Sequence, residues 1–208
     1  GWGVGLHDFD NDTDIDIFVA NGEACLTCEG GGQQNLLFLN NGDGTFVPSE
    51  SFGDAKNSRA AVFSDIDRDG DLDVLISNVG GPPSLLRNDL GGGHWLQMRL
   101  IDGAYSPPVG TRVTAWVGGK TLVRSVKGTP SYGGSSANRV HFGLGDNESV
   151  DKLVVRWPDG VEQVLTNVAA DHFIVVERAE PRQPAASDVD HLPTCIELCG
   201  RLGECGQF

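Results

Sequence analysis

Two nine-residue loops built on alternating aspartates constrain this chain more than any other feature. The first runs from Asp8 to Asp16 and the second from Asp65 to Asp73, with Asp at every odd position of both loops. The segments around them, 6–19 and 63–76, align without gaps at an offset of 57 residues. Each loop joins short apolar runs that have the length and composition of strands. The chain therefore begins with a repeated β unit.

The repeated unit predicts a blade of a β-propeller. Strand-like runs follow each loop, and Asn41-Gly42-Asp43-Gly44 lies between Leu-Leu-Phe-Leu and Thr-Phe-Val as a tight hairpin turn would. About four short strands repeated every 40 to 60 residues are typical of propeller blades. Because propellers close with ~4–8 blades, two units cannot close a ring. We interpret residues 1–90 as the last blades of a larger propeller.

The pattern changes after Gly91-Gly92-Gly93. Residues 91–178 contain short segments in which apolar and polar residues alternate, without a convincing helical period. The expected strands are 95–100, 112–117, 122–126, 153–157, 163–165 and 173–177. Pro158-Asp159-Gly160 is a strong hairpin turn between two of them. The prediction is all-β throughout, with a small β-sandwich following the partial propeller.

The C-terminal part is expected to differ from both. Residues 179–193 are rich in proline and polar residues, as an exposed linker would be, and 194–208 hold three cysteines and too few apolar residues for a core. A segment of that kind needs disulfides to fold. The pairing of the cysteines stays open; they are Cys25, Cys28, Cys195, Cys199 and Cys205. Cys25 and Cys28 could form a redox or zinc pair, but a local loop disulfide is the better interpretation.

The charge of the chain excludes several classes of partner. The sequence has 15 Lys and Arg against 29 Asp and Glu, a formal net charge of −14. A surface this acidic disfavours nucleic acid and anionic membranes as partners. The sequence contains no run of 18 apolar residues, so it predicts no membrane span. Ten of the 29 acidic residues lie in the two loops. That concentration indicates a local chemical purpose.

The loops predict calcium sites. Ca²⁺ takes 6–8 oxygen ligands from carboxylates, backbone carbonyls and water, and accepts an all-carboxylate cage more readily than Mg²⁺ does. Positions 1, 3, 5 and 9 would offer carboxylates, and position 7 its backbone carbonyl. The candidate metal residues are Asp8, Asp10, Asp12, Asp14 and Asp16 in the first loop, and Asp65, Asp67, Asp69, Asp71 and Asp73 in the second.

Two other interpretations of the loops were weighed. An EF-hand needs a bidentate Glu at position 12 and flanking helices, but Val19 and Ile76 stand there, within expected strands. A plain Asp-rich turn would place five carboxylates together with no cation, at ~1 kcal/mol of repulsion per close pair in water. Gly70 provides the turn residue at position 6, whereas Thr13 takes that place in the first loop. The Asp65 site is therefore expected to bind calcium more tightly.

The same residues carry a family resemblance. The Asp loops, the strands that follow them and Asn40-Asn41-Gly42-Asp43-Gly44-Thr45-Phe46 resemble FG-GAP (VCBS) repeats of integrin-like propellers. The segments His94-Trp95-Leu96, 109–113, 141–145 and 154–160 resemble the ASPIC/UnbV domain that follows such repeats in the cartilage acidic protein family. The start of the tail, Asp188-Val189-Asp190, resembles a calcium-binding EGF module whose spacing it does not complete.

The resemblance implies a secreted, calcium-binding protein of the extracellular matrix or cell surface. Such a protein would bind an extracellular protein or glycan as an adhesion molecule, and it would not be an enzyme. The alternative is a carbohydrate-active or other catalytic secreted protein built on a propeller. No P-loop, Gly-x-Ser-x-Gly or His-x-x-x-His motif supports an enzyme.

Three minor features could still belong to a site. His141 near Tyr132 and Ser136 could be functional, although local packing at a strand end explains it more simply. Trp116 and Trp157 could form a sugar-stacking platform, although tryptophans in alternating β segments more often belong to the core. The Asp loops could hold a catalytic metal, but a closed carboxylate cage leaves little open coordination.

Overall fold

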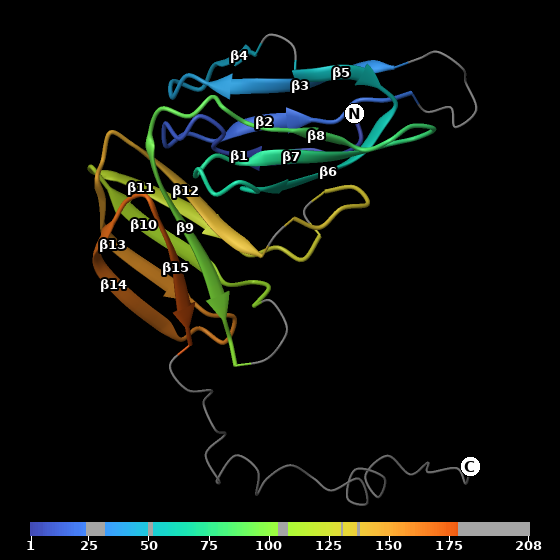
Figure 1. The fold of residues 1–208 in the computed structure, drawn as a ribbon. Coiled ribbons are helices and arrows are strands. Elements are labelled where there is room, and N and C mark those ends of the chain that lie inside the picture. The colour runs from blue at the N-terminus through green and yellow to red at the C-terminus, as the bar shows by residue number, and fades with distance from the viewer. Residues whose placement is uncertain (24–31, 50–51, 104–107, 130, 137, 179–208) are drawn as a thin grey trace, which may run out of the picture. The chain divides into compact units, whose positions relative to one another are not determined.

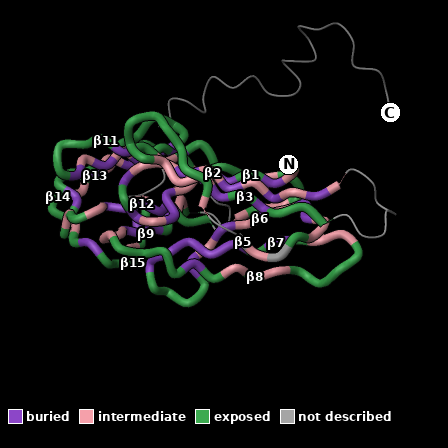
Figure 2. Tube along the Cα trace, turned by 90° about the horizontal axis from the view of Figure 1, so that it is seen from above, coloured by how far each residue is buried: buried purple, intermediate pink, exposed green. Residues whose placement is uncertain are grey.

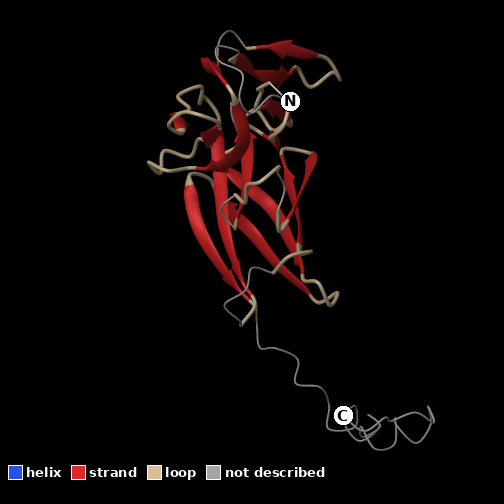
Figure 3. Cartoon of the chain, turned by 90° about the vertical axis from the view of Figure 1, so that its right-hand side faces the viewer, coloured by secondary structure: helices blue, strands red, loops and turns tan. Residues whose placement is uncertain are grey.

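The chain folds into strands, and the computed structural model describes residues 1–23, 32–49, 52–103, 108–129, 131–136 and 138–178. No helix occurs in these segments (Figure 3). The all-β prediction is confirmed. Residues 1–178 form one compact unit that contains two separate hydrophobic clusters. The expected linker, the tail and all five cysteines lie outside the described residues.

The first repeat forms an antiparallel meander (Figure 1). Its strands are β1 (Val4–His7), β2 (Asp16–Val19), β3 (Gln33–Asn40) and β4 (Phe46–Pro48), with β5 (Phe52–Lys56) also paired to β3. The predicted turn between β3 and β4 is confirmed. Gly42 and Gly44 adopt φ of 74° and 87°, and Asn41 N–H donates to the Thr45 carbonyl at 3.0 Å. Glycine adopts such positive φ values with no steric penalty.

The second repeat has three strands, not the four expected of a blade. They are β6 (Ser58–Ser64), β7 (Asp73–Asn78) and β8 (Ser84–Leu86), again antiparallel. After β8 the chain passes through Gly91–Gly93 into the next domain, so no strand equivalent to β4 follows. The two repeats share one cluster of buried residues: Phe9, Phe18, Ala20, Leu37, Ala61, Phe63, Leu72, Val74 and Ile76. Phe9 and Leu72 belong to the Asp loops, so each loop also contributes to the core.

The remaining strands form the predicted sandwich. One sheet has the order β11-β10-β13-β14 and the other β12-β9-β15. The bounds are β9 (His94–Ile101), β10 (Arg112–Val117), β11 (Lys120–Ser125), β12 (Arg139–Gly145), β13 (Ser149–Arg156), β14 (Glu162–Ala169) and β15 (His172–Glu177). Buried side chains from both sheets form a single core between them. The last strand, β15, pairs with β9 in parallel, a long-range pairing that local patterning does not specify.

The middle of strands β9 and β12 is buried on both faces. Leu96, Met98 and Phe142 point into the sandwich core, as alternation requires. Gln97 and His141 lie directly opposite each other on the other face of the sheet, and both are buried as well. Figure 2 colours the buried residues of these two strands purple. This second buried face is the surface on which the Asp loops lie.

Two Asp loops as candidate metal sites

The two Asp loops have the same internal hydrogen-bond framework. At position 1, the carboxylates of Asp8 and Asp65 accept N–H groups from later in their own loops, including Thr13 at 3.0 Å and Gly70 at 3.3 Å. At position 5, the carboxylates of Asp12 and Asp69 accept the N–H two residues on, at 2.8 and 3.0 Å. Asx turns of this kind fold a short loop around its own carboxylates. Sequence repetition has therefore produced structural repetition.

The ninth position fastens each loop to the strands around it. Asp16 begins β2 and accepts Phe9 N–H at 2.7 Å and Asn40 N–H at 2.9 Å. Asp73 begins β7 and accepts Ile66 N–H at 2.8 Å and Asn88 N–H at 2.9 Å. The asparagine is the last residue of β3 in the first repeat and follows β8 in the second. Both oxygens of each Asp keep lone pairs for a cation.

Backbone strain at position 6 separates the two loops. Gly70 has φ of 98° and Thr13 has φ of 88°. Glycine adopts this conformation freely, while a β-branched residue there is an outlier that costs about 1–3 kcal/mol. Thr13 is buried, and its Oγ1 accepts a hydrogen bond from Lys120 Nζ at 2.6 Å. The expectation that the first loop makes its turn with a non-glycine residue is confirmed.

Six of the ten candidate aspartates gather into two groups. Ligand oxygens of Asp8, Asp10 and Asp12 lie within 4.8 Å of one another, and so do those of the second group, Asp65, Asp67 and Asp73. Hard oxygen donors at this spacing match the chemistry of Ca²⁺. The remaining four, at positions 5, 7 and 9, take part in the hydrogen bonds around the groups; they are Asp14, Asp16, Asp69 and Asp71.

The first group carries electrostatic signs of a cation site. Burial raises the pKa of Asp8 to about 8; Arg124 opposes this rise, while Asp12, Asp16 and Asp10 add to it. Burial also raises the pKa of Asp10, and its Oδ1 is buried without a hydrogen-bond partner. A buried, unpaired carboxylate oxygen is costly unless a cation or donor satisfies it. The donor set and the unpaired oxygen therefore fit a calcium ion.

The loops also bind each other. Asn11 Nδ2 donates to Asp71 Oδ1 at 2.7 Å, and Asn88 Nδ2 donates to the Phe9 carbonyl at 2.7 Å; both bonds are buried. Asp71 additionally accepts Gly91 N–H at 3.1 Å. The side chain at position 7 of the second loop therefore holds the loops together, which leaves its carbonyl for the role the sequence had predicted. The two repeats are joined through their candidate metal loops.

Both loops lie on the second buried face of β9 and β12. Gln97 Nε2 donates to Asp65 Oδ2 at 2.7 Å, and His141 Nε2 donates to the Gly70 carbonyl at 3.0 Å. Gly145 N–H donates to the Asn11 carbonyl at 2.8 Å. Gly143 lies so close to the first loop that an added Cβ would stand 2.3 Å from Asp8 Oδ2. The sequence analysis did not predict this contact between the loops and the sandwich. Its sign in the sequence is a polar residue or a glycine at the outward positions of β9 and β12.

The tryptophans and the histidine that were minor candidates for a site have different surroundings in the structure. Trp157 is a core residue of the sandwich, whereas Trp116 is partly exposed on β10 with Lys152 Nζ 5.1 Å from its ring centroid. His141 is buried within β12, and its pKa is lowered to about 4 by burial. Ser136 lines the same cavity as His141, while Tyr132 packs on Trp2 with ring centroids 5.4 Å apart. His141 therefore contacts the second Asp loop instead of packing only locally.

Comparison with known proteins gives two family matches. The model of the FG-GAP-like repeat matches residues 8–76, and that of ASPIC and UnbV matches residues 103–183. The chain therefore resembles FG-GAP-like repeats followed by an ASPIC and UnbV domain. Both Asp loops fall within the repeat match, and β10 to β15 fall within the domain match. The resemblance inferred from the sequence is confirmed.

Two curated relatives align with most of the chain. Cartilage acidic protein 1 of Homo sapiens is 30% identical over 212 residues, covering 96% of this chain and 30% of the relative. Cartilage acidic protein 1 of Xenopus tropicalis is 28% identical over 160 residues, covering 74% of this chain and 23% of the relative. The chain thus spans less than a third of the length of either relative. Among the described residues, no helix has the length and apolar character needed to cross a membrane.

Proposed function

We propose that this chain is part of a calcium-stabilised extracellular protein that binds a matrix or cell-surface ligand. Two relatives that align with most of the chain are named for cartilage, an extracellular matrix. The observation that carries the calcium assignment is the buried, unpartnered Asp10 Oδ1 within a three-carboxylate group. Adhesion to a protein or glycan, and not catalysis, is the proposed role.

Calcium has a structural role in this proposal. Asp8, Asp10 and Asp12 would hold one ion, and Asp65, Asp67 and Asp73 the other. The ion supplies positive charge to carboxylates that otherwise repel one another in a partly buried loop. The same loops bond to each other, to the shared core of the repeats and to the sandwich. Stabilising the loops therefore stabilises both parts of the unit.

Differential scanning calorimetry in calcium and in EGTA tests the proposal. An ion present at about 100 times its Kd stabilises the folded state by about 2.7 kcal/mol per site. For a protein of this size, each kcal/mol raises Tm by about 2–4 °C. Two sites should therefore raise Tm by about 10–20 °C. An equal concentration of magnesium is expected to give a much smaller increase, because Mg²⁺ demands a tighter octahedral geometry.

Matched variants separate specific binding from general charge effects. The double variant Asp10→Asn/Asp67→Asn removes one carboxylate from each group and should lose most of the calcium-dependent increase in Tm. Asp151→Asn removes one carboxylate from an exposed position on β13 and should keep it. Equal Tm values of the unsubstituted chain in calcium and in EGTA would refute structural calcium. Turnover of an oligosaccharide would refute the non-catalytic role.

A further inference from the structure

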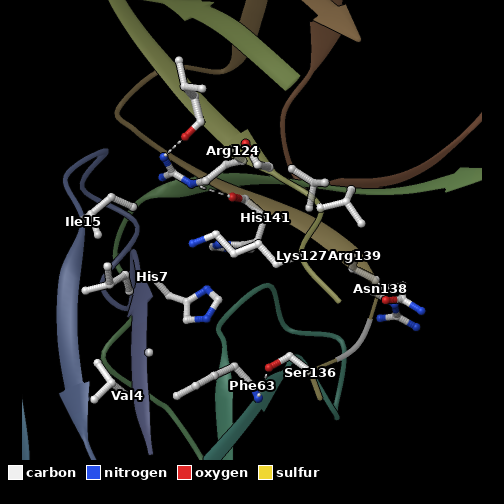
Figure 4. A pocket seen from close by; sticks show the side chains of 16 residues that line it. Val4, His7, Ile15, Phe63, Arg124, Lys127, Ser136, Asn138, Arg139 and His141 are labelled. Atoms are coloured by element: carbon white, nitrogen blue, oxygen red, sulfur yellow. Dashed lines mark hydrogen bonds between the residues drawn. The ribbon is translucent and has the colours of Figure 1, made fainter. Parts of the chain in front are cut away.

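A cavity of about 400 Å³ lies where the two repeats meet the sandwich. Its walls come from β1 and β6 on one side and from β11, β12 and the segment after β11 on the other (Figure 4). The volume is within the range of pockets that hold small molecules. The residues that line it include His7, Phe63, Arg124, Lys127 and His141.

The cavity has the opposite charge to the rest of the chain. Its 16 lining residues include Arg124, Lys127 and Arg139 but no Asp or Glu. The whole sequence has 29 acidic residues against 15 basic ones. A concave site lined by one sign of charge concentrates ligands of the other sign. Within an acidic protein, this cavity is the place where an anion would be attracted.

The positive groups lack anionic partners at hydrogen-bonding distance. Arg124 donates from Nε to the His141 carbonyl at 3.2 Å and from Nη1 to the Val123 carbonyl at 3.1 Å. Its Nη2 is buried without a hydrogen-bond partner and lies 4.0 Å from Asp8 Oδ2. A buried donor is normally satisfied, so Nη2 of Arg124 is available to an anionic acceptor.

Lys127 completes the positive surface at the mouth of the cavity. It is exposed, and within the described part of the chain it forms no ion pair or hydrogen bond. Its side chain lines the cavity together with those of Arg124 and His7 (Figure 4). The charged groups therefore converge on one space.

The opposite wall is apolar. Phe63, Val4 and Ile15 line the cavity from the repeat side. Apolar walls with a few convergent polar groups are typical of small-molecule sites. A bare inorganic ion would leave these side chains facing water. An anion with a hydrocarbon body would cover them.

We infer that the cavity binds a small organic anion, with its acidic group against Arg124 and Lys127 and its carbon skeleton against Phe63. The acidic group is a carboxylate or a sulfate, both of which form charge-assisted hydrogen bonds with arginine. Such groups occur on acidic sugars and on peptides. The inference deepens the proposed function, since it names a ligand class for the same binding protein.

Three aromatic probes test this inference by NMR on the ¹⁵N-labelled chain in calcium. Benzoate and phenyl sulfate carry the two candidate acidic groups, and benzamide is the neutral counterpart of benzoate. Both anions should shift the amide resonances around residues 5–7 and 123–127 in a saturable manner at millimolar concentrations, while benzamide should not. Lys127→Met should weaken binding of the anions about fivefold or more, which corresponds to about 1 kcal/mol.

Lys152→Met is the charge-matched control. Lys152 is exposed on β13, lies over Trp116 and does not line this cavity, so its loss should leave binding of the anions unchanged. Equal binding by benzamide and benzoate, equal affinity in Lys127→Met, or no saturable shift would each overturn the inference. Calcium stabilisation is measured separately by Tm in EGTA. An anion site without calcium stabilisation, or the reverse, would therefore identify which proposal failed.

Discussion

Replacing Gly70 by Ala tests whether the second Asp loop is held against the sandwich in the way the structure shows. Gly70 has φ of 98°, and a Cβ at this position would lie 2.0 Å from Trp95 Nε1. The Gly70 carbonyl also accepts the hydrogen bond from His141. An alanine would therefore have to relax the backbone and displace the indole ring together.

The expected loss of stability has two parts. A non-glycine residue at this φ costs about 1–3 kcal/mol, and forcing extra volume into a packed contact costs about 1–3 kcal/mol more. Gly44→Ala is the matched control, because Gly44 has φ of 87° with no atom within 4 Å of an added Cβ. Gly44→Ala should therefore lose only the backbone part. The difference between the two variants measures the contact with Trp95.

Urea denaturation in saturating calcium, followed by tryptophan fluorescence and circular dichroism, provides the free energies of unfolding. Gly70→Ala should be less stable than Gly44→Ala by about 1–3 kcal/mol, the overpacking part alone. At about 2–4 °C per kcal/mol, its Tm should be about 2–12 °C lower than that of the control. Equal stabilities of the two variants would show that the loop does not press on Trp95, and the described docking would be wrong.

Two further predictions concern the metal loops. The Asp10→Ala variant keeps the second site, and the Asp67→Ala variant keeps the first. In calcium titrations the second site should bind more tightly, because the buried Arg124 beside Asp8 repels a cation more than the exposed Arg87 beside Asp67 does. Equal affinities of the two variants would contradict this order. The pKa of Asp8 is raised to about 8 in the folded state, so the folded chain without calcium holds the carboxyl proton more tightly than the unfolded chain does. The chain without calcium should therefore lose stability as pH rises from about 4 to 8. Because calcium binds the ionised form, the calcium-dependent increase in Tm should be larger at about pH 8 than at about pH 5, and calorimetry showing the opposite trend would refute the assignment.

Local patterning was sufficient for much of the fold. Alternating segments predicted strands at 112–117 and 173–177, and the structure has β10 at Arg112–Val117 and β15 at His172–Glu177. Pro158-Asp159-Gly160 forms its turn, with Trp157 N–H donating to the Val161 carbonyl at 2.8 Å. These features depend on neighbours in the sequence, through side-chain alternation and turn chemistry.

The environment of the metal loops could not be predicted in the same way. Gln97 and His141 occupy outward positions of an alternating pattern, which indicates solvent, yet both are buried against the loops. Their burial depends on a contact between segments more than 30 residues apart, and no local period encodes it. Arg124 was likewise missed, because its position in an alternating strand gives no sign of the cavity it faces.

The exchange of glycine and threonine at position 6 shows how surroundings, more than the loop itself, determine the sequence. Both loops need a positive φ at this position, so an isolated loop would favour glycine twice. In the second loop the Trp95 ring occupies the space of a Cβ, and only glycine fits. In the first loop Lys120 can reach a hydroxyl, and Thr13 supplies it despite the strained backbone. Each loop is thus adapted to the sandwich beside it. A calcium ion that orders the loops would therefore also order the surface of the sandwich, including the cavity wall formed by Arg124 and His141.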